Sequence, residues 1–238
     1  MCGEGIGLLS EYEDELGSVV FARGLGAEEL AVRMGGTPGG GVELTGAEVD
    51  WLIGHAEIAD TMVARVGECG GWAFAVLPQT GYESGSLAIA ASRGGVDVVH
   101  YEPMPWHPPS QFSYCRDGRQ VCGFGIGEES QRWGDDPDHL LPVLVAGGVL
   151  GSDGAGNGSA RSALAVIGEH FGWCLPRESV RRAALPAYTV RGRVDLGPDP
   201  DYEVIRAWAA EHGYALDWPF RGRVPEPIRA AHAMATRN

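Results

Sequence analysis

The sequence predicts an α+β N-terminal domain with a mainly antiparallel sheet, followed by a small all-α helix-loop-helix C-terminal domain. Two observations lead to this prediction. Short β-rich apolar runs and helical stretches succeed one another in irregular order through the first three quarters of the chain, whereas the last part has only helical spacing. We place the first domain at residues 1–185, a Gly- and Pro-containing linker at 186–199 and the second domain at 200–238.

The first predicted elements are a strand over residues 18–23 and a helix over residues 27–34. The strand is β-rich and precedes a glycine, and the helix is stopped by Gly35-Gly36. Thr45 and Glu48 have the spacing of a capping box, so we expect a helical or partly helical stretch that runs toward Val66.

Residues 70–77 are the strongest strand candidate, because a continuous apolar run is bounded there by glycines and Pro78. Such a strand belongs in the centre of a sheet. Asp117-Gly118 predicts a hairpin turn between two further strands. Asp138 is placed as the N-cap of a later helix. The remaining predicted elements are a helix at 84–92, strands at 96–101, 112–116 and 120–124, and helices at 138–146 and 160–171.

The composition, with 44% hydrophobic and 21% charged residues, is that of a globular protein. No segment approaches the roughly 18 to 20 apolar residues that a membrane helix needs, and no basic region precedes an apolar run at the N-terminus. We therefore expect a cytoplasmic protein without membrane contact. The cysteines are odd in number and form no Cys-x-x-Cys pair, so we expect reduced, mostly buried thiols, without a disulfide framework or structural zinc. They are Cys2, Cys69, Cys115, Cys122 and Cys174.

Charge is distributed unevenly along the chain. Residues 1–175 hold 8 Arg against 24 Asp and Glu, a net charge of −16, and residues 176–238 hold 10 Arg against 8, a net charge of +2. The acidic part repels phosphate, so any polyanion contact belongs to the end of the chain. All 18 basic residues are arginine, which excludes a Walker-type phosphate lysine and a Schiff-base lysine.

No motif indicates an enzyme. A Gly-x-Ser-x-Gly elbow and a Cys-His-Asp order are both absent. Two segments offer potential metal ligands, 135–139 with three Asp and His139, and 100–107 with His100, Glu102 and His107. Helix capping by Asp138 in the first segment and an ordinary Pro-rich loop in the second explain these residues more simply. We expect no catalytic residue, no metal site and no cofactor.

The end of the chain predicts two helices joined by a loop. Ile205, Trp208 and Ala209 recur at helical spacing, Gly213 can end the first helix, and Pro225 suits the first turn of the second. We expect the second helix to face back toward Trp208.

The predicted loop carries Arg221-Gly222-Arg223. The glycine lets the backbone approach a surface closely while the two guanidinium groups extend to either side. A narrow, negative A·T minor groove attracts such an arrangement.

This segment resembles the C-terminal DNA-binding domain of the actinobacterial Lsr-type nucleoid-associated silencers, which bridge A·T-rich DNA in an H-NS-like manner. The loop before Arg221 is longer than in that family. The resemblance implies binding to double-stranded A·T-rich DNA through Arg221, Gly222 and Arg223, with phosphate contacts from Arg206 and Arg229. The matching residues are Ile205 to Ala209, Gly213, Arg221 to Pro225, and Ile228 to His232.

Two alternatives stay open for the tripeptide. It can be a solvated turn, and the helix-loop-helix arrangement is also similar to the peripheral subunit-binding domains of acyltransferase complexes, which bind protein. That similarity implies a protein-interaction or immunity-type module.

The N-terminal part resembles an uncharacterised domain family common in streptomycetes and their relatives, a resemblance that implies no activity. It is carried by 21–25, Gly71-Trp72, Asp117-Gly118 and 134–142, among others. We expect a non-enzymatic, nucleoid-associated or regulatory DNA-binding protein whose N-terminal domain senses a ligand, binds a partner or self-associates.

Overall fold

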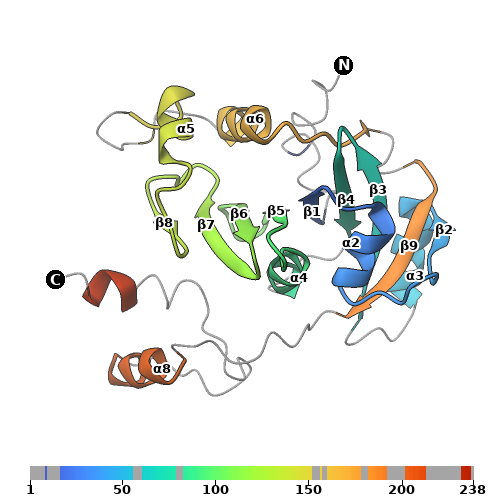
Figure 1. The fold of residues 1–238 in the computed structure, drawn as a ribbon, viewed down its shortest axis with the longest axis horizontal. Coiled ribbons are helices and arrows are strands. Elements are labelled where there is room, and N and C mark those ends of the chain that lie inside the picture. The colour runs from blue at the N-terminus through green and yellow to red at the C-terminus, as the bar shows by residue number, and fades with distance from the viewer. Residues whose placement is uncertain are drawn as a thin grey trace. The chain divides into compact units, whose positions relative to one another are not determined.

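The computed structural model describes residue 9 and residues 17–55, 61–78, 83–151, 156, 160–177, 182–191, 202–212 and 232–236. The chain divides into two compact units, Met1–Val194 and Asp195–Asn238. One nine-stranded sheet, with the order β2-β9-β3-β4-β1-β5-β6-β7-β8, dominates the first unit (Figure 1). All of its strand pairs are antiparallel. The strands are β1 (Ser18–Arg23), β2 (Val42–Leu44), β3 (Thr61–Cys69), β4 (Trp72–Leu77), β5 (Asp97–Glu102), β6 (Gln111–Arg116), β7 (Arg119–Gly125), β8 (Arg132–Trp133) and β9 (Leu185–Arg191).

The sheet has an aromatic face and an alanine-rich face, and strand β4 contributes to both. Its sequence, Trp-Ala-Phe-Ala-Val-Leu, is buried throughout. Because side chains alternate along a strand, Trp72 and Phe74 enter the aromatic core while Ala73 and Ala75 face the opposite side. A strand buried on both faces shows a continuous apolar run, which is why this segment was recognisable from the sequence.

Helices cover both faces of the sheet. On the alanine-rich face lie α2 (Ala27–Arg33) and α4 (Glu83–Ala91), where small side chains let the helices pack closely. On the aromatic face lie α5 (Leu141–Ala146) and α6 (Ala160–Phe171), which contribute Leu144, Leu164 and Ile167 to that core. Figure 1 shows α5 and α6 on the side of the sheet opposite to α2 and α4. Helix α3 (Gly46–His55) packs beside β3 and β9 through Val49.

The predicted fold class is wrong. The chain is mainly β, with helices around one large sheet, and its antiparallel pairing is the part of the prediction that agrees. In the second unit, the described residues form α8 (Tyr202–Glu211) and a helical segment at 232–236. Among these described residues, Tyr202, Ile205 and Ala209 are buried together in one small cluster.

Several local predictions are confirmed. Strands β1, β4 and β5 and helices α2, α4 and α6 form within one or two residues of the expected positions. Asp117 and Gly118 both have positive φ, +54° and +75°, as a two-residue hairpin turn requires. The capping box is present, since the Thr45 N–H donates to Glu48 Oε2 at 2.8 Å and the Glu48 N–H donates to Thr45 Oγ1 at 3.3 Å.

Three other local predictions are wrong. The helical stretch toward Val66 ends at His55, and strand β3 occupies residues 61–69 because β4 and β9 pair with it. The predicted linker begins inside β9, which the sheet holds between β2 and β3, so the first unit continues to Val194. Asp138 does not cap α5, whose N-cap is Leu140 without a side-chain hydrogen bond.

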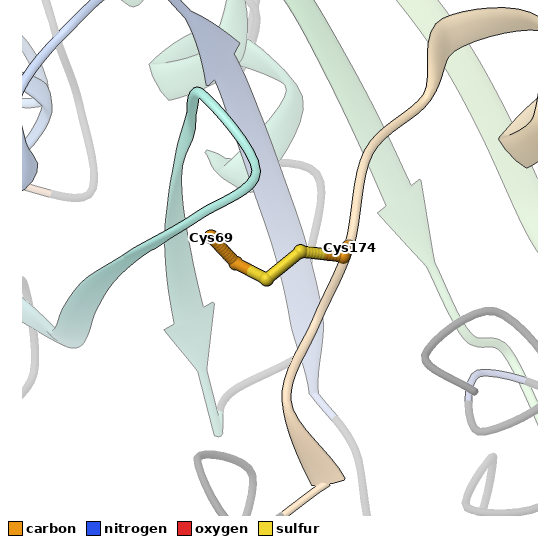
Figure 2. Close-up of a disulfide and its surroundings, with 2 residues drawn as sticks. All are labelled: Cys69 and Cys174. Atoms are coloured by element: carbon orange, nitrogen blue, oxygen red, sulfur yellow. A yellow bond between two sulfur atoms is a disulfide. The ribbon is translucent and has the colours of Figure 1, made fainter. Parts of the chain in front are cut away.

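The expectation of reduced cysteines is wrong for one pair. Cys69 and Cys174 form a disulfide with a Cα–Cα distance of 5.6 Å (Figure 2). They are 105 residues apart, so their proximity depends on the fold and not on local spacing. Cys115 and Cys122 are buried and lie outside this disulfide, and Cys2 lies outside the described residues. Among the described helices, none has the length and apolar character needed to cross a membrane.

Glycine at position 67 makes room for the aromatic core. Gly67 pairs with Phe74 across β3 and β4, and a Cβ at position 67 would lie 2.5 Å from Phe74 Cζ. We therefore expect Gly67→Ala to lower the free energy of unfolding by about 1–3 kcal/mol through overpacking. Urea unfolding measures this change.

The matched control is Gly85→Ala in α4. A Cβ at position 85 meets nothing within 4 Å. Alanine is also the better helix former, so Gly85→Ala should raise stability by up to about 1 kcal/mol. Equal effects of the two substitutions would contradict the packing explanation.

Candidate nucleic-acid interface

Helix α8 forms where the DNA-binding resemblance begins. Ile205 and Ala209 lie one turn apart on the buried side of the helix, and Tyr202 precedes them by another turn. Trp208 packs against these three residues and is half-buried. The helix therefore has a small apolar side and an exposed polar side.

Trp208 also joins α8 to the end of the chain. Its ring stacks on His212 at a centroid distance of 4.4 Å and meets His232 edge-on at 5.3 Å. His232 begins the helical segment 232–236, and its carbonyl oxygen accepts a hydrogen bond from Thr236 Oγ1 at 3.0 Å. Trp208 thus contacts one residue before and one residue after the segment 213–231, which carries the Arg-Gly-Arg tripeptide and lies outside the described residues.

Of the five predicted DNA contacts, only Arg206 lies in the part that the structure describes. Its guanidinium lies on the exposed side of α8, 45% exposed, with Nη1 at 3.4 Å from Glu203 Oε2. An exposed ion pair of this kind contributes little to stability. Arg221, Gly222, Arg223 and Arg229 lie outside the described residues.

The net charge of the second unit limits how strongly it can attract DNA. Residues 195–238 hold five Arg and seven Asp and Glu, a net charge of −2. Five arginines in the segment just before it, residues 176–194, account for the positive balance of the last part of the chain. Any DNA contact must therefore come from the local arrangement of a few arginines and not from a generally basic surface.

The acidic segment 135–139 does not gather its ligands in one place. Arg119 pairs with Asp135 at 3.5 Å, and Arg132 pairs with Asp138 at 2.7 Å. His139 Nδ1 lies 3.2 Å from Asp136 Oδ2. Nor do His100, Glu102 and His107 converge: within the described ranges, no three His, Cys, Asp or Glu side chains could hold a metal ion together.

His100 takes part in a buried network that the sequence did not indicate. Its Nε2 lies 3.0 Å from Ser84 Oγ, and its Nδ1 lies 3.5 Å from Ser113 Oγ. Ser18 Oγ donates to Ser84 Oγ at 3.1 Å. His100 is 3% exposed, and burial lowers its pKa to about 4, so the ring is neutral at neutral pH.

A serine beside a histidine can act as a nucleophile and its base, but this pair lacks access. Ser84 and Ser18 have no exposed surface, and the lowered pKa makes His100 a weak base. The hydroxyl groups instead satisfy the hydrogen-bonding needs of a buried imidazole. Sequence reasoning missed this network because its members come from β1, α4, β5 and β6.

Comparison with known proteins places the first unit in a family. Residues 17–169, more than half of the chain, match a family of unknown function, DUF6461. The chain belongs to DUF6461. The DUF6461 match runs from the start of β1 into the last turn of α6, so β9 and the second unit lie beyond it. Neither the curated proteins nor the solved structures contain a match to this chain.

Proposed function

We propose that the chain is a non-enzymatic, nucleoid-associated or regulatory protein that binds double-stranded, A·T-rich DNA. Arg221 and Arg223 would enter the minor groove on either side of Gly222, and Arg206 and Arg229 would contact phosphates. The DUF6461 unit would sense a ligand, bind a partner or self-associate, because its acidic surface repels DNA.

One structural observation supports this proposal in addition to the resemblance to the Lsr-type DNA-binding domain. Trp208 on α8 contacts His232 at 5.3 Å, so the residues on both sides of the tripeptide are held together. Fixing the two ends of a segment reduces the conformational entropy that the segment loses on binding. An Arg-Gly-Arg tripeptide in such a segment is better suited to a groove than one in a free tail.

The test is the affinity of the full chain for A·T-rich and G·C-rich duplexes of equal length. We expect tighter binding to the A·T duplex, because the guanine amino group obstructs the floor of the minor groove. With about two to four phosphates neutralised, the plot of log affinity against log salt should have a slope of roughly −2 to −4.

Three variants separate the roles of the arginines. The double variant Arg221→Ala, Arg223→Ala should lose about 1–3 kcal/mol of binding free energy on the A·T-rich duplex. It should then bind the A·T-rich and G·C-rich duplexes equally. The double variant Arg221→Lys, Arg223→Lys keeps both positive charges but loses the planar guanidinium groups. Its affinity should therefore depend on salt as that of the wild type does, but without the preference for the A·T-rich duplex. Arg206→Ala should lower the affinity for the A·T-rich and the G·C-rich duplex by equal amounts. Wild-type affinity of the double alanine variant would refute the proposal and favour a protein-binding role for this segment.

A further inference from the structure

The disulfide links two parts of the first unit that the fold brings together. Cys69 is the last residue of β3, and Gly70 and Gly71, with φ of +61° and +81°, turn the chain into β4. Cys174 lies in the segment between α6 and β9. Figure 2 shows the bond running from the hairpin to this segment, which passes beside it. The Cα–Cα distance of 5.6 Å fits an ordinary disulfide.

The two cysteines differ in their access to solvent. Cys69 is half-buried at the hairpin turn. Cys174 is 3% exposed and lies between Trp173 and Leu175, each 1% exposed. An incoming thiolate therefore reaches the bond from the Cys69 side, and Cys174 is the leaving group.

Other contacts hold the segment in place without the bond. Trp173 stacks on Phe21 of β1 at 4.9 Å and on Phe171 at 5.5 Å. Arg23 Nη2 donates to the carbonyl oxygen of Phe171 at 2.6 Å and its guanidinium lies over the Trp72 ring at 4.8 Å. Opening the disulfide thus removes one constraint among several, and the aromatic core stays assembled.

We propose that the Cys69–Cys174 bond is a redox switch, which a dithiol reductant opens while the nine-stranded sheet stays folded. One thiolate of the reductant attacks Sγ of Cys69, the S–S bond breaks, and Sγ of Cys174 leaves as a thiolate that takes up a proton. The second thiol of the reductant then attacks the mixed disulfide and releases Cys69 as a thiol. The reductant loses two electrons and two protons and becomes a disulfide, and the protein gains two thiols.

The switch is specific to this pair among the described cysteines. Cys115 and Cys122 are 1% and 0% exposed in the middle of the sheet. Burial raises the pKa of the Cys122 thiol to about 12, which keeps it protonated and unreactive. The switch lies within the first unit and does not depend on DNA binding by the second.

The experiment compares the oxidised and reduced forms of the full chain in native buffer. Dithiothreitol opens the bond, iodoacetamide traps the thiols, and peptide mass spectrometry locates the label. We expect label at Cys69 and Cys174 but not at Cys115 or Cys122, and re-formation of the bond with oxidised glutathione. Amide exchange should become on the order of tenfold faster in residues 172–177, while strand β5 keeps its protection.

Two variants serve as controls. Cys69→Ser with Cys174→Ser should show the exchange pattern of the reduced form and no response to dithiothreitol. Cys115→Ala with Cys122→Ala should respond as the wild type does.

Three outcomes would overturn the switch. The bond could resist dithiothreitol until a denaturant is added. Reduction could raise exchange throughout the sheet, which would make the bond purely structural. The native thiols could also fail to pair in the presence of oxidised glutathione. All three outcomes are measured on wild-type protein, so the test remains valid even if the serine variant does not fold.

Discussion

Replacing Trp173 by alanine is expected to lower the free energy of unfolding by about 3–5 kcal/mol, as large-to-small substitutions of buried aromatic residues do. Trp173 is 1% exposed and contacts Phe21, Phe171, Trp72 and Phe112. Removing the indole leaves a cavity where the sheet, the segment after α6 and the hairpin with the disulfide meet. Urea unfolding under non-reducing conditions measures the loss.

Two substitutions test the cause. In the described part of the chain, Trp173 Nε1 is buried without a hydrogen-bond partner, so Trp173→Phe sacrifices no hydrogen bond and should cost less than the alanine variant. Trp106 is 87% exposed, and Trp106→Ala should change stability by no more than about 0.5 kcal/mol. A loss for Trp106→Ala as large as that for Trp173→Ala would contradict the core role of Trp173.

Acidification is expected to remove about 3 kcal/mol of stability through His100 alone. Burial lowers the pKa of His100 from 6.5 to about 4. Between these two values the unfolded chain binds a proton that the folded chain does not, so stability falls as the pH falls through this window. Above pH 6.5 both states hold the neutral ring, and the His100 contribution is constant.

Unfolding free energies of the wild type and of His100→Gln, measured at a series of pH values from 7.5 to about 4.5, isolate this effect. Glutamine can bond Ser84 but does not titrate in this range. The titration of carboxylates changes the unfolding free energy of both proteins alike, so it cancels when one curve is subtracted from the other. As the pH falls below 6, the unfolding free energy of the wild type should decrease more steeply than that of His100→Gln, by up to about 1.4 kcal/mol per pH unit. Parallel curves would mean that His100 is protonated equally in both states.

Short-range patterns predicted many of the elements. The Trp-Ala-Phe-Ala-Val-Leu run of β4 identified a strand in the sheet interior, and Asp117-Gly118 identified the β6–β7 hairpin. Thr45 and Glu48 identified the start of α3. Each of these features depends on residues a few positions apart, where backbone sterics and local hydrogen bonds decide the conformation.

Long-range pairing was not predictable in the same way. Strand β9 enters the sheet between β2 and β3, more than a hundred residues from either, and its presence there turned a predicted linker into a strand. The local pattern predicts a helical stretch up to Val66, within β3, because the strand character of β3 depends on partners at both edges. The prediction of the fold class was wrong for this reason, because that prediction used the order of the elements along the chain and not the pairing of the strands.

Neighbouring residues were enough to predict the Asp117-Gly118 turn, the capped start of helix α3, the doubly buried strand β4 and the position of helix α8. The nine-strand order, the Cys69–Cys174 bond and the network around His100 were not predictable from neighbouring residues. All three have the same cause. Each joins side chains or strands from distant parts of the chain, and their approach is set by the packing of the whole core and not by the conformational preferences of neighbouring residues.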